Sequence, residues 1–173
     1  MSVASAFKAA WEDVCCPAYQ KGEINNECTL HAMLYAELRA RLPRPKYLVL
    51  CEPQLDNAVP DIVVLDTADQ TIVGIGELKL DRYPKFKGDL EKLARLARSE
   101  AKFPLLLDPA QMQFHSNFGV SPNCVLAFGV IGADDSEAVD ERTLLSKMDE
   151  HGVRADRFVP LIHKARATSR TAS

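Results

Sequence analysis

Residues 60–80, PDIVVLDTADQTIVGIGELKL, decide the fold of this chain. Two apolar segments rich in β-branched residues flank a polar stretch, which predicts two strands joined by a hairpin loop over residues 67–71. Charge enters these strands at only a few places. Asp61 opens the first strand after a proline, and Glu77 and Lys79 interrupt the second strand shortly before it ends.

The alternation of side chains along a strand predicts how these charges are arranged. Residues two apart share a face, so Glu77 and Lys79 are expected beside each other, in line with Val73 and Ile75. The other face is expected to carry the apolar side chains Ile72, Leu78 and Leu80. A strand that is apolar on both faces is usually central and covered.

The predicted hairpin register brings the two carboxylates together. It places Asp61 opposite Glu77, where antiparallel neighbours lie roughly 5 Å apart. Two carboxylates and the ammonium of Lys79 would then share a half-buried site, in which like charges repel and desolvated charges need partners. A divalent cation meets this need, and hard oxygen ligands at the edge of a sheet suit Mg²⁺.

Pro60-Asp61, fifteen intervening residues and then Glu77-Leu78-Lys79 resemble the signature of the PD-(D/E)xK nuclease superfamily. The resemblance implies a restriction-endonuclease-like α/β fold with an αβββαβ core, in which a mixed central sheet is flanked by helices. It also implies a metal-dependent nuclease. The Gln-x-x-x-Tyr element of the RecB-like subgroup is not found.

The superfamily pattern assigns roles to individual residues. Asp61, Glu77 and the carbonyl of Leu78 would hold Mg²⁺, for which Mn²⁺ can substitute, and Lys79 would orient the attacking water. Glu27 matches the first-helix glutamate of many members and would assist through a bound water. An equally supported alternative for Glu27 is a first-turn position that is favourable to the helix dipole.

Hydrophobic periodicity and the positions of proline and glycine predict the remaining elements. They are helices over 4–15, 27–42, 89–102 and 141–151, and strands over 47–51, 123–132 and 157–163. Residues 103–122 have no clean period. Pro17 and Gly22 are expected to end the first helix, and Asp89 is expected to cap the third. We predict a single domain over residues 1–173, with its core at about 26–132, a C-terminal helix and edge strand over 139–163, and a disordered tail over 164–173.

Basic residues gather after the second hairpin strand. Lys85 and Lys87, in a glycine-containing loop, are predicted to contact nucleic-acid phosphates. The basic residues of the following helix, including Lys92, fit a solvated face with intrahelical ion pairs at least as well. His31 is interpreted as a packing or surface residue, and Glu52 as an exposed loop residue, with an approach to the metal from the neighbouring strand as its alternative.

Composition limits the functional classes. The formal net charge is −3, so any nucleic-acid surface must be local. Five cysteines without zinc-site spacing indicate reduced thiols and a cytoplasmic protein. No segment approaches the ~20 apolar residues of a membrane span.

The sequence therefore predicts a Mg²⁺-dependent nuclease acting on nucleic acid, with DNA as the expected substrate. No membrane partner is expected, and the sequence leaves open whether the chain acts alone, as a homodimer or inside a larger restriction, repair or defence assembly. The alternative is a catalytically inactive nuclease fold that serves as a binding or assembly module, because a fold does not fix its function.

Overall fold

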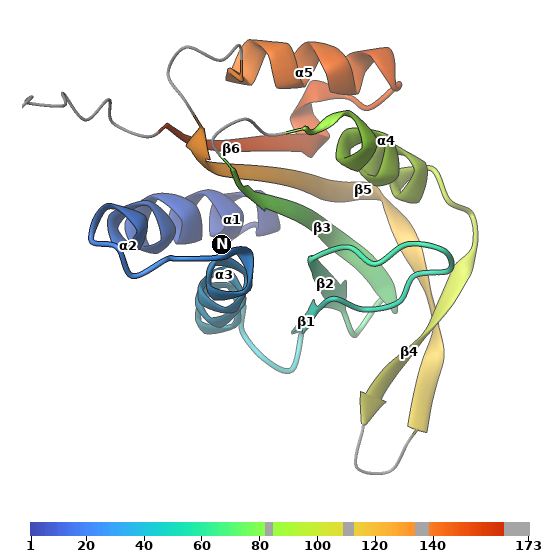
Figure 1. Cartoon of the computed structure of the whole chain (residues 1–173). Helices are drawn as coiled ribbons and strands as arrows, with labels where there is room; N and C mark the ends of the chain where they lie inside the picture. Colours follow the sequence, from blue (N-terminus) through green and yellow to red (C-terminus); the bar gives the residue numbers. More distant parts are fainter. Residues whose placement is uncertain (82–84, 109–112, 134–138, 165–173) are drawn as a thin grey trace, which may run out of the picture.

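The computed structural model describes residues 1–81, 85–108, 113–133 and 139–164, which form a mixed six-stranded sheet with helices on both faces (Figure 1). The strands are β1 (Tyr47–Cys51), β2 (Ile62–Asp66), β3 (Thr71–Leu80), β4 (Lys102–Asp108), β5 (Gln113–Ala133) and β6 (Phe158–Lys164). Their order is β1-β2-β3-β5-β4, and β6 also pairs with β5.

The central pair of the sheet is β3 and β5, which run parallel. The neighbours β1 and β2 continue the sheet antiparallel from β3. The 21-residue strand β5 serves two partners along its other edge: its first part pairs antiparallel with β4 and its last part pairs parallel with β6. Strand β3 is therefore covered by strands on both sides, as the apolar sequence predicts.

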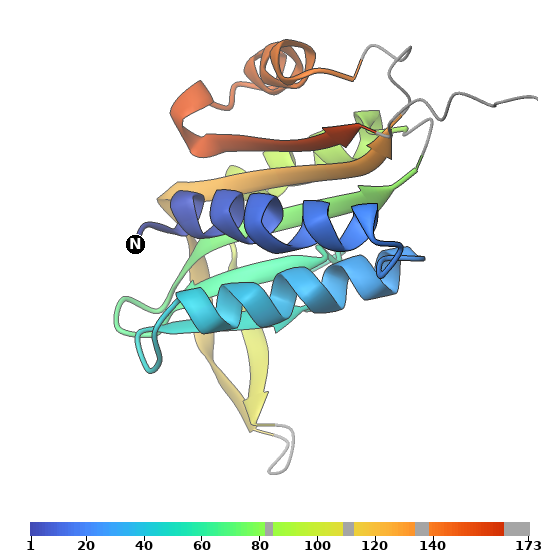
Figure 2. The same ribbon diagram turned by 90° about the vertical axis from the view of Figure 1, so that its left-hand side faces the viewer.

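Helices divide the core into two layers. One face carries α1 (Val3–Ala10), the π-helical segment η1 (Trp11–Cys15), α2 (Cys16–Gln20) and α3 (Glu27–Arg41), which Figure 2 shows lying across the sheet. The other face carries α4 (Lys87–Ala97) and α5 (Glu141–Glu150), and a short 3-10 turn, η2 (Ala155–Arg157), precedes β6. In the part of the chain that the structure describes, no helix has the length and apolar character to cross a membrane.

The first helix does not end at Pro17 as predicted. A π-helical turn lies directly before this proline, and the helix continues through α2 to Gln20. Proline lacks an N–H, and its ring clashes with the carbonyl four residues earlier. The wider π-helical turn accommodates that mismatch, so the sequence rule gave the wrong end.

The predicted hairpin is confirmed, with a bulge that the sequence analysis did not foresee. Ile62 pairs with Gly76, but the register shifts between Val64 and Leu65, so Leu65 pairs with Ile72. Ile72 consequently packs in the core layer of α4 while Val73 packs in that of α1 and α3, the reverse of the predicted faces. From Gly74 onward the alternation is as predicted, so Ile75, Glu77 and Lys79 share one face.

The segment without a clean period is a pair of strands. Residues 102–108 form β4, and β5 begins ten residues before the predicted start at Asn123. Helix α4 starts at Lys87 and ends at Ala97, whereas the prediction was 89–102, and Asp89 lies inside its first turn instead of capping it.

The other predictions are close to the structure. The helices over 27–42 and 141–151 and the strands over 47–51 and 157–163 match α3, α5, β1 and β6 within a residue. The order α3, β1, β2, β3, α4, β5 contains the predicted αβββαβ core, with β4 added. Lys164 ends β6, and the rest of the predicted tail lies outside the described residues.

Candidate active site

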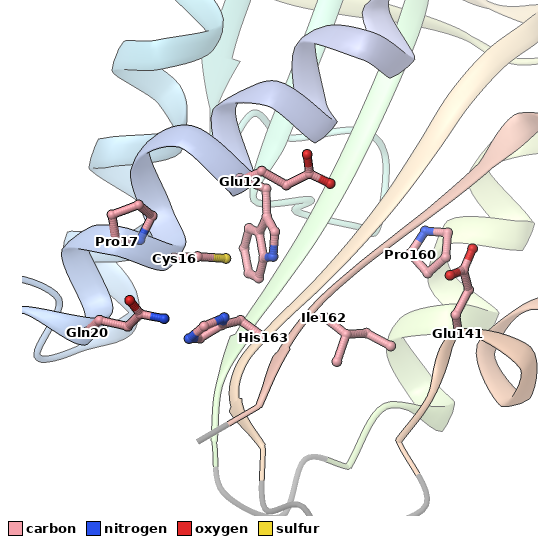
Figure 3. Close-up of a pocket in the computed structure, with 9 residues that line it drawn as sticks. Glu12, Cys16, Pro17, Gln20, Glu141, Pro160, Ile162 and His163 are labelled. Atoms are coloured by element: carbon pink, nitrogen blue, oxygen red, sulfur yellow. The ribbon is translucent and has the colours of Figure 1, made fainter. Parts of the chain in front are cut away.

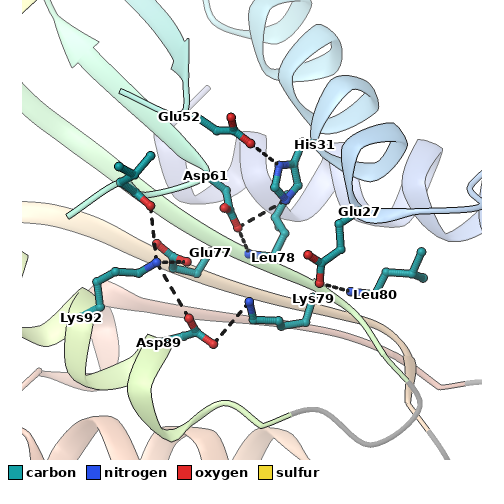
Figure 4. A network of polar contacts seen from close by, with 11 residues as sticks. Glu27, His31, Glu52, Asp61, Glu77, Leu78, Lys79, Leu80, Asp89 and Lys92 are labelled. Atoms are coloured by element: carbon teal, nitrogen blue, oxygen red, sulfur yellow. Dashed lines mark hydrogen bonds and ion pairs between the residues drawn. The ribbon is translucent and has the colours of Figure 1, made fainter. Parts of the chain in front are cut away.

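The predicted site residues meet where β2 begins and β3 ends (Figure 4). Asp61 lies one residue before β2, and its Oδ2 accepts a hydrogen bond of 2.6 Å from the backbone N–H of Leu78. Since Ile62 pairs with Gly76, Asp61 stands next to Glu77 across the hairpin. This bond fixes the Asp61 carboxylate against β3.

Glu77 is the most enclosed charge of the site, with a side-chain exposure of 1%. Its Oε2 lies 2.6 Å from the Nζ of Lys92, while its Oε1 is buried without a hydrogen-bond partner among the described residues. Burial, followed by the nearby charge of Asp61, raises the pKa of Glu77 to about 8, although Lys92 opposes the shift. The carboxyl group therefore requires further positive charge to ionise fully at neutral pH.

Asp61 is held by several groups at once. Besides Leu78, the imidazole Nε2 of His31 lies 3.4 Å from Asp61 Oδ2. Burial raises the pKa of Asp61, while the Leu78 N–H and the charges of His31, Lys92 and Lys79 act in the opposite direction. Two neighbouring carboxyl groups with raised pKa values are typical of functional sites.

Lys79 shares the face of Glu77, as predicted, and pairs with helix α4. Its Nζ lies 3.5 Å from Asp89 Oδ2. Burial acts to lower the pKa of Lys79, but the charges of Asp89, Glu27, Asp61 and Glu77 outweigh burial and raise it. Lys79 is therefore a firmly protonated cation beside the two carboxylates.

Lys92 is the site residue that the sequence analysis missed. It lies on α4 between the two acidic groups: its Nζ contacts Glu77, the carbonyl oxygen of Val59 at 3.4 Å and Asp89 Oδ1 at 3.8 Å. An intrahelical ion pair of the kind expected for this helix exists with Asp89, but the stronger partner comes from the sheet. The available signal was the position of Asp89 and Lys92, three residues apart, beside the buried stripe of Leu90 and Leu93.

Glu27 reaches β3 from the first turn of α3. Asn26 caps this helix by accepting a hydrogen bond of 2.8 Å from the Thr29 N–H, which leaves the Glu27 side chain available for other contacts. Glu27 Oε1 accepts a hydrogen bond of 3.3 Å from the backbone N–H of Leu80. The structure thus brings Glu27 to the same end of β3 as Lys79, in a first-turn position that also suits the helix dipole.

His31 and Glu52 belong to the same polar network, which the sequence analysis did not predict. His31 is buried one turn after Glu27, and its Nδ1 lies 3.4 Å from Glu52 Oε1. Glu52 is exposed, as expected, but its backbone has a φ of 49°, which turns the chain directly after β1. His31 therefore links the first turns of α3 to both the β1 end and Asp61.

The predicted phosphate-contacting lysines lie outside this network. Lys85 and Lys87 are both exposed. Lys87 is the first residue of α4, so it extends from the N-terminal turn of a helix instead of from a loop. Lys85 lies between β3 and α4, so both lysines follow Lys79 closely in the chain.

The site residues fit a hard divalent cation by donor chemistry. Carboxylate and carbonyl oxygens are the ligands such ions prefer, and the orphaned Oε1 of Glu77 is a buried acceptor in need of a partner. Within the described residues, no three His, Cys, Asp or Glu side chains already surround a metal position. The ammonium of Lys92 lies on the carboxylate of Glu77, so binding of an ion there requires this side chain to move.

A hollow lies elsewhere, between the N-terminal helices and β6 (Figure 3). It measures about 570 Å³, and Glu12, Cys16 and Gln20 line it from one side, with Ile162 and His163 on the other. None of the predicted site residues lines it. The carboxylate cluster is thus a compact polar site separate from this hollow.

Comparisons with known proteins bear on the fold. Neither the scan against protein-family models nor the search of curated proteins finds a match. In structure, the chain is similar to NucC from P. aeruginosa ATCC27853 in its cAAA-bound form, with 10% identity, a TM-score of 0.50, and coverage of 92% of this chain and 74% of that chain.

NucC from E. coli MS115-1 is matched over the same shares of both chains. The cAAA-bound form has 12% identity and a TM-score of 0.44, and the apo form has 13% identity and a TM-score of 0.43. At these identities a similarity shows the fold alone. The P. aeruginosa match supports the conclusion that this chain has a mixed α/β fold similar to that of NucC, with a curled mixed sheet flanked by helices.

Proposed function

We propose that the chain is a metal-dependent nuclease that hydrolyses phosphodiester bonds of nucleic acid, with DNA as the expected substrate. The observation that carries this proposal is the pair of adjacent, desolvated carboxyl groups at one end of β3. Glu77 has a buried unpartnered oxygen and a pKa raised to about 8. Such a pair needs additional positive charge. The resemblance to the PD-(D/E)xK superfamily indicates that Mg²⁺ supplies it.

The proposed metal ligands are Asp61, Glu77 and the carbonyl of Leu78. When bound, Mg²⁺ or Mn²⁺ would supply Lewis-acid stabilisation of the phosphate and lower the pKa of a bound water. Asp61 is already fixed by the Leu78 N–H, so its carboxylate needs no reorganisation to act as a ligand.

The remaining residues would act on water and phosphate. Lys79, a cation beside both carboxylates, would orient the attacking water and neutralise charge that develops on the phosphate. Glu27, which is anchored to the Leu80 N–H, would hold a second water at the same end of β3. Lys85 and Lys87 would contact the nucleic-acid backbone from the segment that follows the site.

A metal titration combined with a cleavage assay tests the proposal. Mg²⁺ is titrated into wild-type protein, Glu77→Gln and Asp61→Asn by calorimetry, and the same proteins are incubated with single-stranded and duplex DNA. We expect wild type to bind the ion and cleave, and each variant to lose at least ~100-fold in cleavage rate, since removing one preorganised electrostatic group typically costs that much.

Asp56→Asn is the matched control, because Asp56 is an exposed carboxylate in the loop before β2. It should retain wild-type binding and cleavage. Full-rate cleavage by Asp61→Asn would contradict the proposed role of that carboxylate.

The inactive binding module remains the second candidate, and one contact favours it. Lys92 already neutralises Glu77 at 2.6 Å, so part of the cluster is satisfied within the protein itself. On this reading, Mg²⁺ would not bind and the cluster would be a structural ion-pair network. The titration separates the two functions, because a self-sufficient network gains nothing from a divalent ion.

A further inference from the structure

Lys92 holds the most enclosed anionic group of the proposed nuclease site. Its Nζ makes a short ion pair with Glu77 Oε2 at 2.6 Å, the closest of its contacts. The remaining contacts, with the Val59 carbonyl at 3.4 Å and with Asp89 at 3.8 Å, are longer. An ammonium therefore occupies the carboxylate that the proposed function assigns to a metal ion.

The two partners of this ion pair differ in exposure. The Glu77 side chain is 1% exposed and its Oε1 is fully buried, whereas the Lys92 side chain is 24% exposed. Figure 4 shows the Lys92 ammonium reaching Glu77 from helix α4, so this ion pair joins an enclosed carboxylate to a more exposed side chain. A divalent ion that approaches this carboxylate comes close to the ammonium, and because the two cations repel each other at such range, metal binding favours movement of Lys92 away from Glu77.

We infer that Lys92 is a built-in counter-cation that occupies Glu77 in the resting protein and must be displaced before a divalent metal ion binds there. This inference rests on the proposed function and adds to it a way in which the site is controlled. Lys92 is a positioning residue that acts through Glu77 and is not one of the metal ligands.

The same helix offers the displaced ammonium a second partner. Asp89 lies one turn before Lys92 on α4, with its Oδ1 3.8 Å from Lys92 Nζ and its Oδ2 3.5 Å from Lys79 Nζ. A rotation of the Lys92 side chain toward Asp89 moves its charge off Glu77 without unfolding of α4. Asp89 thereby couples the position of Lys92 to that of Lys79, the residue proposed to orient water.

Calorimetric titration of Mg²⁺ into wild type, Lys92→Met and Lys92→Arg tests the inference. Affinities are measured at several pH values and extrapolated to the high-pH limit, where the proton no longer competes for Glu77. We expect Lys92→Met to bind Mg²⁺ about tenfold more tightly than wild type, since a charge-assisted hydrogen bond no longer has to be broken. Lys92→Arg, which retains the charge, should stay near wild type.

Arg95→Met is the matched control, because it removes one exposed cation from the same helix away from Glu77. It separates the specific contact from the general loss of positive charge. Equal tightening in Arg95→Met and Lys92→Met would overturn the inference, as would weaker or unchanged binding in Lys92→Met, which is expected if Lys92 merely supports Glu77.

A second measurement uses the wild-type chain and so does not depend on the folding of a variant. Lysine acylation is followed by mass spectrometry as Mg²⁺ is added, with Lys147, paired with Glu150 on α5, as internal reference. Labelling of Lys92 should rise with the midpoint of ion binding. Unchanged labelling at saturating Mg²⁺ would overturn the inference alone, whereas no Mg²⁺ binding by wild type or Lys92→Met would overturn the proposed function as well.

Discussion

At the scale of single residues, the protonation of Glu77 links the site to stability. Its pKa rises from 4.5 to about 8 on folding, mainly because the side chain is buried. Between these values the folded chain retains a proton that the unfolded chain has released. This group therefore lowers the free energy of unfolding as pH rises from about 4.5 to about 8, and has no further effect above that range.

The prediction concerns the slope of stability with pH. Wild type should lose more stability than Glu77→Gln between about pH 5 and pH 8, because the variant cannot ionise at this position. Urea unfolding at a series of pH values, followed by the fluorescence of the single tryptophan, measures both slopes. Asp61 also has a raised pKa, so some slope should persist in the variant. Identical slopes in the two proteins would contradict the raised pKa of Glu77.

What the sequence predicted at this scale follows from local geometry. The predicted hairpin register placed Asp61 beside Glu77, and the structure places them so, although the loop is one residue shorter than predicted and the bulge in β3 makes up the difference. Lys92 was missed because its partner is distant in sequence and its long side chain reaches from the helix to the sheet. A pattern along one helix identifies an i, i+3 partner but not a partner across the core.

At the scale of elements, the contact between the N-terminal helical segment and β5 depends on a glycine. A Cβ at Gly129 would lie 2.7 Å from Leu78 Cδ2 and 2.9 Å from Trp11 Cζ3, closer than such atoms can approach. Both neighbours are fully or almost fully buried, so neither can move freely. The absence of a side chain here lets Trp11 pack against the middle of the sheet.

We therefore expect Gly129→Ala to destabilise the fold by about 1–3 kcal/mol, the usual cost of overpacking a core. Gly119→Ala is the matched control in the same strand, because a Cβ there meets no atom within 4 Å. Urea unfolding of both variants provides the measurement. Equal stability in the two variants would contradict the packing argument.

The elements differed in how well their sequences predicted them. The hairpin has two β-branched segments around a polar turn, and α3 has an asparagine cap and leucines at helical spacing, so both were found nearly to the residue. The strand β4 and the first half of β5 were missed, because prolines interrupt residues 103–122 and no clean alternation marks either strand. The two strands are stabilised by pairing with each other, and this contact cannot be read from the local sequence of either strand.

At the scale of the whole molecule, charge limits how the protein can hold nucleic acid. The net charge is −3, so a phosphate-contacting surface must be confined to a few cations near the site. Lys85 is exposed between β3 and α4, and Lys87 is exposed at the start of α4. They are the described cations nearest in the chain to Lys79 that are not engaged with the carboxylate cluster.

The prediction is that Lys85→Ala combined with Lys87→Ala weakens DNA binding and makes it less dependent on salt. Loss of two phosphate contacts should reduce the slope of log affinity against log salt by about 1.8 on duplex DNA. Fluorescence anisotropy at a series of salt concentrations measures this slope. The control is Lys8→Ala combined with Lys147→Ala, which has the same net charge but removes lysines on other helices. If this control lost as much slope, the net charge of the protein and not the position of the lysines would determine the salt dependence.

The bulge in the β2–β3 hairpin has a consequence for how this protein tolerates change. The register shifts by one residue between Ile72 and Gly74. As a result, the alternation of side chains between the two faces of the sheet is set separately for the turn end of β3 and for the end that carries Glu77. Insertions or deletions near the turn can be absorbed at this point without rotating Glu77 to the opposite face of the sheet. The bulge thus separates the loop from the end of β3 that carries Glu77 and Lys79, so the loop can be redesigned while these two side chains keep their orientation.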